Sequence, residues 1–338
     1  MIKIEYNKDL SARNTFGMKV SCGCYMEYDS QEDLFRIDFD DIPQPYFHIG
    51  GGSNLLFTKD YSGTVLHSGI KFLKKMGDGE DDVLVEAGAG VKFDDFVDWA
   101  CALGLWGAEN LSNIPGEVGA AAVQNIGAYG VEAKDIILRV NAFDLTRREM
   151  VVIENRDCHY GYRTSVFKEE AKGRYIITSV LFRLTRIYSP KLDYGNIRAA
   201  LQDYKTINPS DVRKVITGIR SSKLPDPSHT GSAGSFFKNP VVSQEDFERI
   251  VSVAGNGVEV PHFQVDDKVK IPAAWMIEQC GFKGMSYGGA AVYEKQPLVL
   301  VNLSGDASPD EILALEEKVI EGVRSKFGVE LHPEVEHI

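Results

Sequence analysis

The segment from Asn113 to Gly130 constrains the fold more than any other part of the chain, because no side chain at 119–122 is larger than a methyl group. Such residues let two pieces of backbone cross closely, or let a large planar or phosphorylated ligand approach the backbone. Gln124 and Asn125 follow directly and can donate and accept hydrogen bonds. The residues alone leave packing and ligand binding equally open.

A second glycine-rich segment, GGGSN at 50–54, lies between two apolar runs. Its backbone amides could approach a pyrophosphate because no Cβ intervenes, although glycine turns without ligands are frequent and this segment alone favours an ordinary turn. The chain has no GxxxxGK[ST] motif, and its nearest GxGxxG match places Phe93 where a small residue has to pack. The sequence therefore predicts neither a P-loop nor a Rossmann dinucleotide site.

Composition narrows the class of partners. The formal net charge of −12 over 338 residues argues against an extended nucleic-acid surface, because phosphates are bound by clustered Lys and Arg. Five cysteines without a CxxC pair, and seven histidines without metal spacing, predict neither disulfides nor a metal site. The N-terminal residues lack the apolar run of a signal peptide, and no segment is apolar for long enough to span a membrane. We expect a cytoplasmic monomer without nucleic-acid or membrane partners.

Periodicity predicts helices and strands throughout, and hence an α/β or α+β class. Residues 1–66 are interpreted as short strands with turns, and a strand from Val83 precedes a helix from Phe93. Helices are also predicted after the start signals at Asn208, Ser243 and Ser308, the last of which opens the capping box SPDE. Further strands are predicted at ILRVNAFDL and MVVI, joined as a hairpin, at YIITSVLFRL and at LVLVNL, and a further helix is predicted at AAWMIEQC, ending at Gly281.

Three polar residues have an ordinary interpretation when each is taken by itself. Ser235 lies in the turn GSAGSFFKNP, which can aim a hydroxyl into a cleft, but a serine in a tight turn more often bonds only its local backbone. Arg163 and Glu334, in isolation, are typical of surface charges. A functional role for any of the three needs support from the rest of the chain.

That support comes from eight motifs that follow one another along nearly the whole chain. They are NTFG, GGGSNLL, NIPGEVGAAAVQNIGAYGVE, GYRTS, SSKLPDP, GSAGSFFKNP, GGAAV and the terminal PEV. In this order they resemble the UDP-N-acetylenolpyruvoylglucosamine reductase family, also called the MurB family. Each motif is weak alone, but an ordered set of this size makes a chance resemblance very improbable.

The resemblance implies an α+β (α/β-type) multidomain fold. A two-part FAD-binding module of the vanillyl-alcohol-oxidase (PCMH) type would occupy residues 1–66 and 67–207. A C-terminal α+β substrate domain would follow at 208–338, with the final residues packing back on the first subdomain.

The resemblance also implies the residues of the site. It implies non-covalent FAD bound by Gly50, Gly51, Gly52, Ser53, Asn54, Leu55, Ile114, Pro115, Gly116, Gly119, Ala120, Ala121, Gln124, Asn125 and Gly127. It implies substrate binding by Tyr129, Tyr194, Lys223, Asn239 and Gln296, of which Tyr194 matches the loop tyrosine of one family subtype. It implies catalytic roles for Arg163, Ser235 and Glu334, and no metal.

The implied activity is FAD-dependent reduction of UDP-N-acetylglucosamine enolpyruvate to UDP-N-acetylmuramate, with NADPH as co-substrate, in peptidoglycan precursor synthesis. Arg163 and Glu334 would stabilise the charge that develops on the substrate, and Ser235 would protonate its C2. A cluster of basic residues between Arg213 and Lys238 agrees with two anionic ligands. The alternatives are an FAD-dependent oxidase of the same fold and a non-catalytic UDP-sugar-binding protein.

Overall fold

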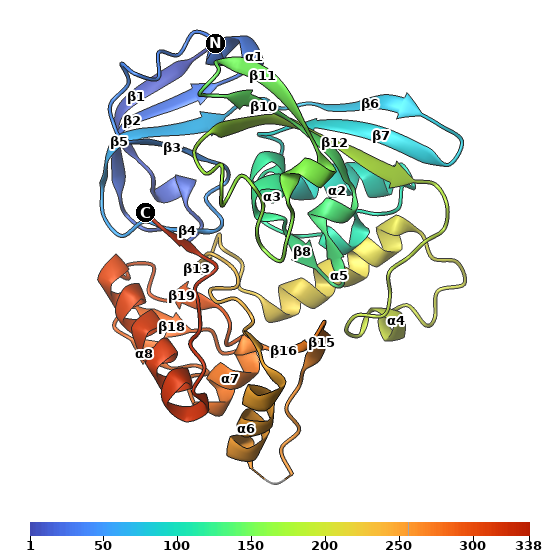
Figure 1. Cartoon of the computed structure of the whole chain (residues 1–338), viewed down its shortest axis with the longest axis vertical. Coiled ribbons are helices and arrows are strands. Elements are labelled where there is room, and N and C mark those ends of the chain that lie inside the picture. The colour runs from blue at the N-terminus through green and yellow to red at the C-terminus, as the bar shows by residue number, and fades with distance from the viewer. Residues whose placement is uncertain (256) are drawn as a thin grey trace. The chain divides into compact units, whose positions relative to one another are not determined.

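A computed structural model of the chain describes residues 1–255 and 257–338. The chain forms two compact units, and each contains segments that are far apart in the sequence (Figure 1). The first unit consists of Met1–Lys8, Cys22–Gly51 and Tyr61–Ser222, and the second consists of Asp9–Ser21, Gly52–Asp60 and Lys223–Ile338. The division into residues 1–66, 67–207 and 208–338 stays a prediction.

The first unit contains two larger sheets. In the four-stranded sheet, with order β1-β2-β5-β3, the pairs β2/β5 and β3/β5 are parallel, and in the five-stranded sheet, with order β11-β10-β12-β7-β6, all pairs are antiparallel. The strands are β1 (Lys3–Asp9), β2 (Ser21–Tyr28), β3 (Tyr46–Ile49), β5 (Tyr61–Ser68), β6 (Leu73–Asp78), β7 (Asp82–Gly88), β10 (Ile137–Asp144), β11 (Glu149–Glu154) and β12 (Tyr175–Thr185), with a small pair β8 (Gly127–Ala128) and β9 (Val131–Glu132).

Helices cover the five-stranded sheet and close the core of the first unit. The buried rings of Phe93 and Phe96 on α2 lie in contact with the ring of Phe182 on β12, so apolar burial fixes α2 on the sheet (Figure 1). The helices of this part are α1 (Gln31–Leu34), α2 (Phe93–Ala102), α3 (Val118–Gln124), α4 (Ile197–Ala200) and α5 (Pro209–Lys223).

In the described residues of the second unit, three α-helices pack with three small sheets. The sheets have the orders β13-β19-β18-β17, β14-β16-β15 and β20-β4, the last a parallel pair that joins the final residues of the chain to residues 55–56. The elements are β4 (Leu55–Leu56), β13 (Gly231–Ser232), β14 (Val241–Val242), α6 (Gln244–Ala254), β15 (Phe263–Val265), β16 (Lys268–Lys270), α7 (Ala273–Gln279), β17 (Ser286–Tyr287), β18 (Ala290–Val292), β19 (Leu300–Asn302), α8 (Pro309–Phe327) and β20 (Glu336–His337).

The elements predicted from caps and turns are confirmed. Ser308 Oγ accepts from Glu311 N at 3.3 Å, and Ser308 N donates to Glu311 Oε2 at 2.8 Å, which is the capping box that opens α8. Ser243 caps α6 in the same way by accepting from Asp246 N at 3.0 Å. The predicted hairpin is β10 and β11, closed at the pair Asp144 and Glu149. Among the described residues, three α-helices were not predicted: the short helices α1 and α4, and α3, which forms inside the glycine- and alanine-rich segment.

The described residues contain neither a membrane-spanning helix nor a cluster of metal ligands. Among them no helix combines the length and the apolar composition that a membrane crossing requires. No group of three or more His, Cys, Asp or Glu side chains in residues 1–255 and 257–338 could hold a metal ion.

Candidate functional site

In the first unit, the two glycine-rich segments lie against each other. A Cβ added to Gly51 would come within 3.3 Å of Gly116 Cα, and one added to Gly50 would come within 3.0 Å of Ala120 Cβ. The small side chains are therefore required for packing, which was one of the two interpretations left open. Gly51 is nevertheless exposed, so its bare backbone also faces solvent. A backbone without a Cβ fits the close approach of a pyrophosphate such as that of FAD.

Backbone hydrogen bonds fix the second glycine-rich segment on both sides. Gly116 O accepts from Phe93 N at 3.0 Å, while Val118 N donates to Val91 O at 2.9 Å and Gly119 N donates to Ala89 O at 3.0 Å. The beginning of α3 is thus bound to the residues that join β7 to α2. A backbone surface held in this way is preorganised for a ligand.

Asn125 serves mainly to hold the surrounding loops together. It is fully buried and has a left-handed backbone, and its amide donates to Gly161 O at 2.8 Å and accepts from Lys134 N at 3.0 Å. Because its side-chain amide is used inside the protein, a contact of Asn125 with a cofactor has to come from its backbone. Gln124, the neighbouring predicted contact, accepts from Lys168 Nζ at 2.8 Å.

The same loops bring Arg163 to the β8 strand. Arg163 Nη2 donates to Gly127 O at 2.6 Å, and its guanidinium lies 5.2 Å from the centre of the Tyr162 ring. Arg163 has a positive φ of 57°, a conformation that is uncommon for a non-glycine residue and is often found at functional sites. The predicted catalytic arginine is therefore held by the glycine-rich segment that is predicted to bind the cofactor.

A second arginine, Arg220 of α5, lies in the same region and was noted from the sequence only as part of a basic cluster. Its Nε donates to Asn113 O at 3.1 Å. Burial lowers the pKa of Arg220, Tyr129 and Asp94 oppose this, and the charge of Arg163 lowers it further. Arg220 and Arg163 therefore lie close enough to repel each other, and Tyr129 lies near Arg220.

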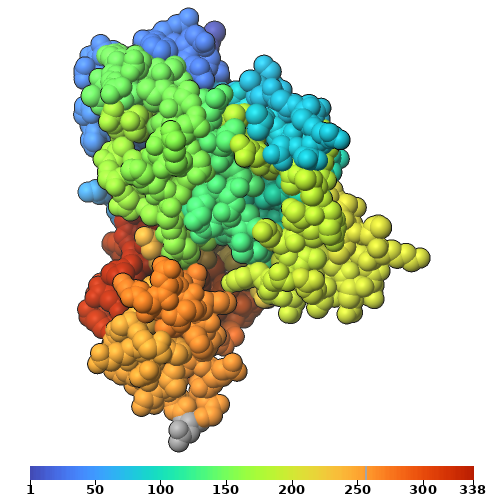
Figure 2. Space-filling model, turned by 45° about the vertical axis from the view of Figure 1, so that its right-hand side comes forward, coloured from blue at the N-terminus to red at the C-terminus, as the bar shows by residue number. Residues whose placement is uncertain are grey.

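Tyr129 and Tyr194 lie together, with ring centroids 6.1 Å apart in an edge-to-face arrangement. Asn110 supports both, since its fully buried amide donates to Tyr129 O at 2.9 Å and to Lys191 O at 2.8 Å. The chain near residues 190–205 lies at the molecular surface (Figure 2) and Tyr194 is exposed. A nucleotide could therefore reach its ring.

The second unit brings together Ser235 and Glu334, which are about a hundred positions apart in the sequence. Glu334 N donates to Phe236 O at 2.8 Å, so the residue after Ser235 is bonded directly to Glu334. Asn54 Nδ2 donates to Glu334 O at 3.0 Å from the other side. Ser235 is exposed and follows Gly234, where the backbone bends with a φ of +73°.

The remaining predicted substrate residues lie in the same unit. Asn239 Oδ1 accepts from Ala273 N at 2.9 Å at the start of α7. Lys223 is exposed at the end of α5, and Gln296 is half-buried before β19.

Comparison with known proteins places this geometry in a family. Residues 42–151 match the FAD binding domain, and residues 226–338 match the C-terminal domain of UDP-N-acetylenolpyruvoylglucosamine reductase. The chain is 48% identical over 337 residues to the UDP-N-acetylenolpyruvoylglucosamine reductase of Bacteroides fragilis strain YCH46, covering 99% of this chain and 100% of that protein. The corresponding reductase of Neisseria gonorrhoeae is 43% identical over 342 residues, covering 99% and 97%. This chain belongs to the UDP-N-acetylenolpyruvoylglucosamine reductase family.

A crystal structure of the family agrees with the fold. The reductase (MurB) from Thermus caldophilus matches 100% of this chain and 98% of its own with a TM-score of 0.69, at 22% sequence identity. The two matched domains also carry the motifs of the resemblance, since the first includes both glycine-rich segments and the second includes Ser235 and Glu334. The predicted α+β fold with an FAD-binding part and a family-specific C-terminal part is confirmed.

One argument made from the basic cluster needs correction. Arg213 Nη2 donates to Asp94 Oδ2 at 3.0 Å, and its Nε donates to Asp98 Oδ1 at 2.8 Å, which binds α5 to α2. The hydrogen bond with Asp94 is the main reason that the pKa of Arg213 is raised. Arg213 is engaged in a structural ion pair, so Arg220 rather than Arg213 is the arginine of this helix that lies beside Tyr129.

The cysteines of this family member do not form a covalent flavin link readily. Burial raises the pKa of Cys22 to about 11, that of Cys101 to about 12 and that of Cys158 to about 11, so these thiols are protonated at neutral pH. Burial also raises the pKa of Cys24 and Cys280. A protonated, buried thiol is a poor nucleophile, which fits a non-covalent cofactor.

Proposed function

We propose that the chain catalyses the FAD-dependent reduction of UDP-N-acetylglucosamine enolpyruvate to UDP-N-acetylmuramate, with NADPH as co-substrate, in peptidoglycan precursor synthesis. The observation that carries the proposal is the 48% identity to a named reductase over the full length of both proteins. We also propose a cytoplasmic location, a monomeric state, and a role in cell-wall biogenesis that supports cell shape and cell division.

FAD, when bound, would accept two electrons from the nicotinamide and deliver them to the double bond of the enolpyruvyl group. We propose that Gly50 to Leu55 and the segment from Ile114 to Gly127 hold this cofactor. The exposed backbone of Gly51 and its packing on Gly116 support the proposal. Residues 1–66 and 67–207 would then form the two FAD-binding subdomains, and 208–338 the substrate domain.

Arg163 and Arg220 are proposed to bind the carboxylate of the substrate. The two guanidinium groups repel each other, and an anion beside them would remove that repulsion. Negative charge grows on the carboxylate and on the enolic oxygens as the double bond is reduced, so preorganised cations stabilise this state more than the starting substrate. Glu334 is proposed to act as an acid that, together with the Arg163 cation, stabilises this developing negative charge.

Ser235 is proposed to deliver the proton to C2. Ser235 is exposed, and the next residue, Phe236, holds Glu334 through its carbonyl. A serine hydroxyl is a weak acid, so the step requires a strongly basic carbon and a cation or water that stabilises the oxyanion left behind. Lys238, three residues further on, is the candidate cation.

The UDP portion is proposed to lie against Tyr129 and Tyr194, with its phosphates and neighbouring groups bound by Lys223, Asn239 and Gln296. The paired tyrosine rings and the support that Asn110 gives them agree with this. Aromatic rings at a surface loop are suited to stacking on a base.

The visible spectrum of the purified protein, before and after denaturation, tests the proposal. A flavin band that leaves the precipitate on denaturation, together with NADPH oxidation that depends on the enolpyruvyl substrate, is expected. A colourless protein would favour a binding protein, and a band that stays with the precipitate would favour a covalently linked oxidase.

A further inference from the structure

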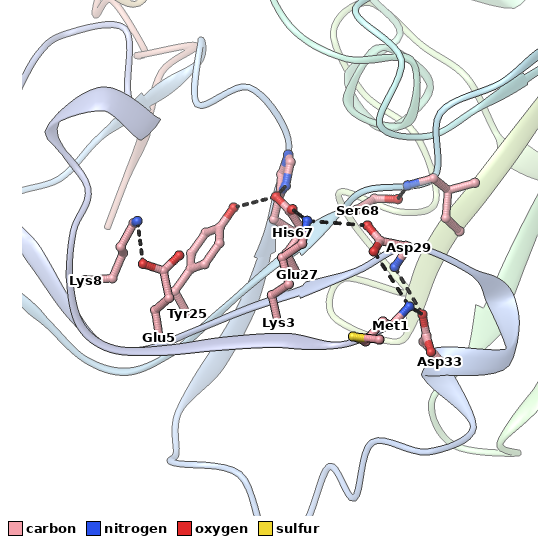
Figure 3. A network of polar contacts seen from close by, with 11 residues as sticks. Met1, Lys3, Glu5, Lys8, Tyr25, Glu27, Asp29, Asp33, His67 and Ser68 are labelled. Atoms are coloured by element: carbon pink, nitrogen blue, oxygen red, sulfur yellow. Dashed lines mark hydrogen bonds and ion pairs between the residues drawn. The ribbon is translucent and has the colours of Figure 1, made fainter.

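His67 lies in the core of the first unit, where its two ring nitrogens contact Glu27 and Glu117. It lies near the end of β5 and is 2% exposed. Nδ1 lies 3.0 Å from Glu27 Oε2 on β2, and Nε2 lies 2.9 Å from Glu117 Oε1, at the residue that precedes α3. Figure 3 shows the first half of this arrangement, in which Lys3, Glu27 and His67 follow one another from the edge strand inward.

The hydrogen bonds of His67 define its protonation state. An ionised carboxylate has no proton to donate, so both ring nitrogens must donate when both face ionised carboxylates. Lys3 Nζ donates to Glu27 Oε1 at 2.9 Å. Although burial acts to raise it, the hydrogen bonds from Lys3 and His67 lower the pKa of Glu27 to about 2. Glu27 is therefore bonded by Lys3 at one oxygen and by His67 at the other, and the second ring nitrogen of His67 faces Glu117.

The other groups that face His67 fit this assignment. His48 on β3 accepts or donates one hydrogen bond with Tyr28 at 2.7 Å, and burial together with the charge of His67 lowers the pKa of His48 to about 3. Burial raises the pKa of Tyr28, and the charge of Glu117 raises it further. Tyr25 stacks on His67 with ring centroids 6.2 Å apart. His67 thus lies at the centre of this buried polar group.

Glu117 carries the contact from His67 to the glycine-rich segments. A Cβ added to Gly50 would lie 3.4 Å from Glu117 Oε2, so the carboxyl packs against the Gly50 backbone. Glu117 O accepts from Ala121 N at 2.8 Å in the first turn of α3, and its neighbours Gly116 and Val118 are bonded to the segment after β7. A shift of this side chain would therefore disturb both segments at once.

We propose that His67 is a positioning residue for the FAD site, in which its imidazolium holds Glu117 against Gly50 and so fixes the two glycine-rich segments in the arrangement that binds the flavin nucleotide. The inference rests on the proposed placement of FAD at these segments. Removing the imidazolium leaves a buried carboxylate without a cation, which favours displacement of Glu117 toward water.

The test compares H67Q with D144N in the purified holoenzyme. Asp144 is also a buried carboxylate of the first unit, paired with Arg174 Nη2 at 2.6 Å, but it lies in the β10–β11 hairpin. Flavin release on dilution, followed by the rise of free FAD fluorescence, should show at least about a tenfold weaker FAD affinity in H67Q, as expected when a charged hydrogen-bond partner is lost. D144N should unfold more easily in urea and keep the wild-type FAD affinity.

A double-mutant cycle separates positioning from general destabilisation. If His67 acts through Glu117, the FAD affinity of H67Q/E117Q should be no weaker than that of the worse single variant. Multiplicative losses, or an unchanged FAD affinity in a folded H67Q, would overturn the inference. A colourless wild-type protein would instead overturn the proposed function itself.

The protonation state has its own readout. In protein labelled with ¹⁵N-histidine, the signals that disappear in H67Q belong to His67, and they should show a proton on both ring nitrogens at neutral pH. Signals typical of a neutral imidazole would contradict the proposal that an imidazolium at His67 holds Glu117.

Discussion

Gly51 offers a direct test of the glycine-rich contact, because a single methyl group is placed against backbone. In G51A the new Cβ would lie 3.3 Å from Gly116 Cα, closer than the 3.5–4.0 Å at which carbon atoms attract. Gly116 cannot move freely, since its carbonyl accepts from Phe93 N at 3.0 Å. One of the two segments therefore has to shift.

The expected cost follows from this contact. Inserting a methyl group into a well-packed contact typically costs about 1–3 kcal/mol. If the shift falls on the cofactor-binding arrangement, FAD affinity weakens by roughly 5- to 150-fold, because each 1.4 kcal/mol is a factor of ten. The assay is titration of the apo-protein with FAD, followed by flavin fluorescence, alongside urea unfolding of the apo-protein.

G218A provides the matched control. Gly218 is exposed within α5, and a Cβ there would meet no atom within 4 Å. This substitution should raise the free energy of unfolding by about 0.5–1 kcal/mol and leave FAD affinity unchanged. If G51A binds FAD as tightly as the wild type does, the reasoning that ties the glycine-rich segments to the cofactor is refuted.

Three further outcomes are expected. S235A should still be reduced by NADPH but should no longer be reoxidised by the enolpyruvyl substrate, and stopped-flow traces with both half-reactions intact would remove Ser235 from the mechanism. Tyr194→Ala should raise the KM for the UDP-sugar by the equivalent of roughly 1–3 kcal/mol, and Tyr194→Phe less, while reduction by NADPH changes little; an unchanged KM in a folded, yellow Y194A contradicts the stacking. The hydrogen bonds of Arg174 lower the pKa of buried Asp144, so this pair stabilises the fold above about pH 4, the ordinary range of an aspartate, and the stabilisation is lost as the pH falls through the lowered pKa. The free energy of unfolding, measured with urea from pH 7 to pH 3, should therefore decrease less steeply with falling pH for D144N than for the wild type. The same decrease in both proteins would show that the pair does not contribute to stability.

Local signals in the sequence predicted the elements whose causes are local. The box formed by Ser308 and Glu311 involves residues three positions apart, and both of its hydrogen bonds are present. The helix from Phe93 follows from apolar spacing within one element, and its aromatic face is buried as predicted. The missed helix α3 has small residues at most of its positions, so it offers no apolar period, although alanine favours helix.

Supporting residues of the site could not be found in this way. The partners of Asn110 are at 129 and 191, and those of His67 are at 27 and 117, so nothing near either residue in the sequence indicates its role. Glu117 occupies a position in the glycine-rich motif that the resemblance does not constrain, and only its contact with His67 indicates a role for it. Residues that act through long-range hydrogen bonds need the folded structure to be recognised.

The GGGSNLL motif is divided between the two compact units of the chain. The resemblance treats it as one cofactor-binding segment, yet Gly50 and Gly51 belong to the first compact unit and the residues from Gly52 onward belong to the second. Gly52 has a φ of +62°, and a Cβ there would lie 2.0 Å from Arg13 O, so glycine is required for a backbone reason that involves no ligand. Asn54 donates to Glu334 O and its own carbonyl accepts from Glu336 N at 3.0 Å, so it fixes the segment that carries the proposed acid. One continuous motif therefore contributes to both compact units, because its first residues leave bare backbone exposed at Gly51 and Asn54 bonds the segment that carries Glu334.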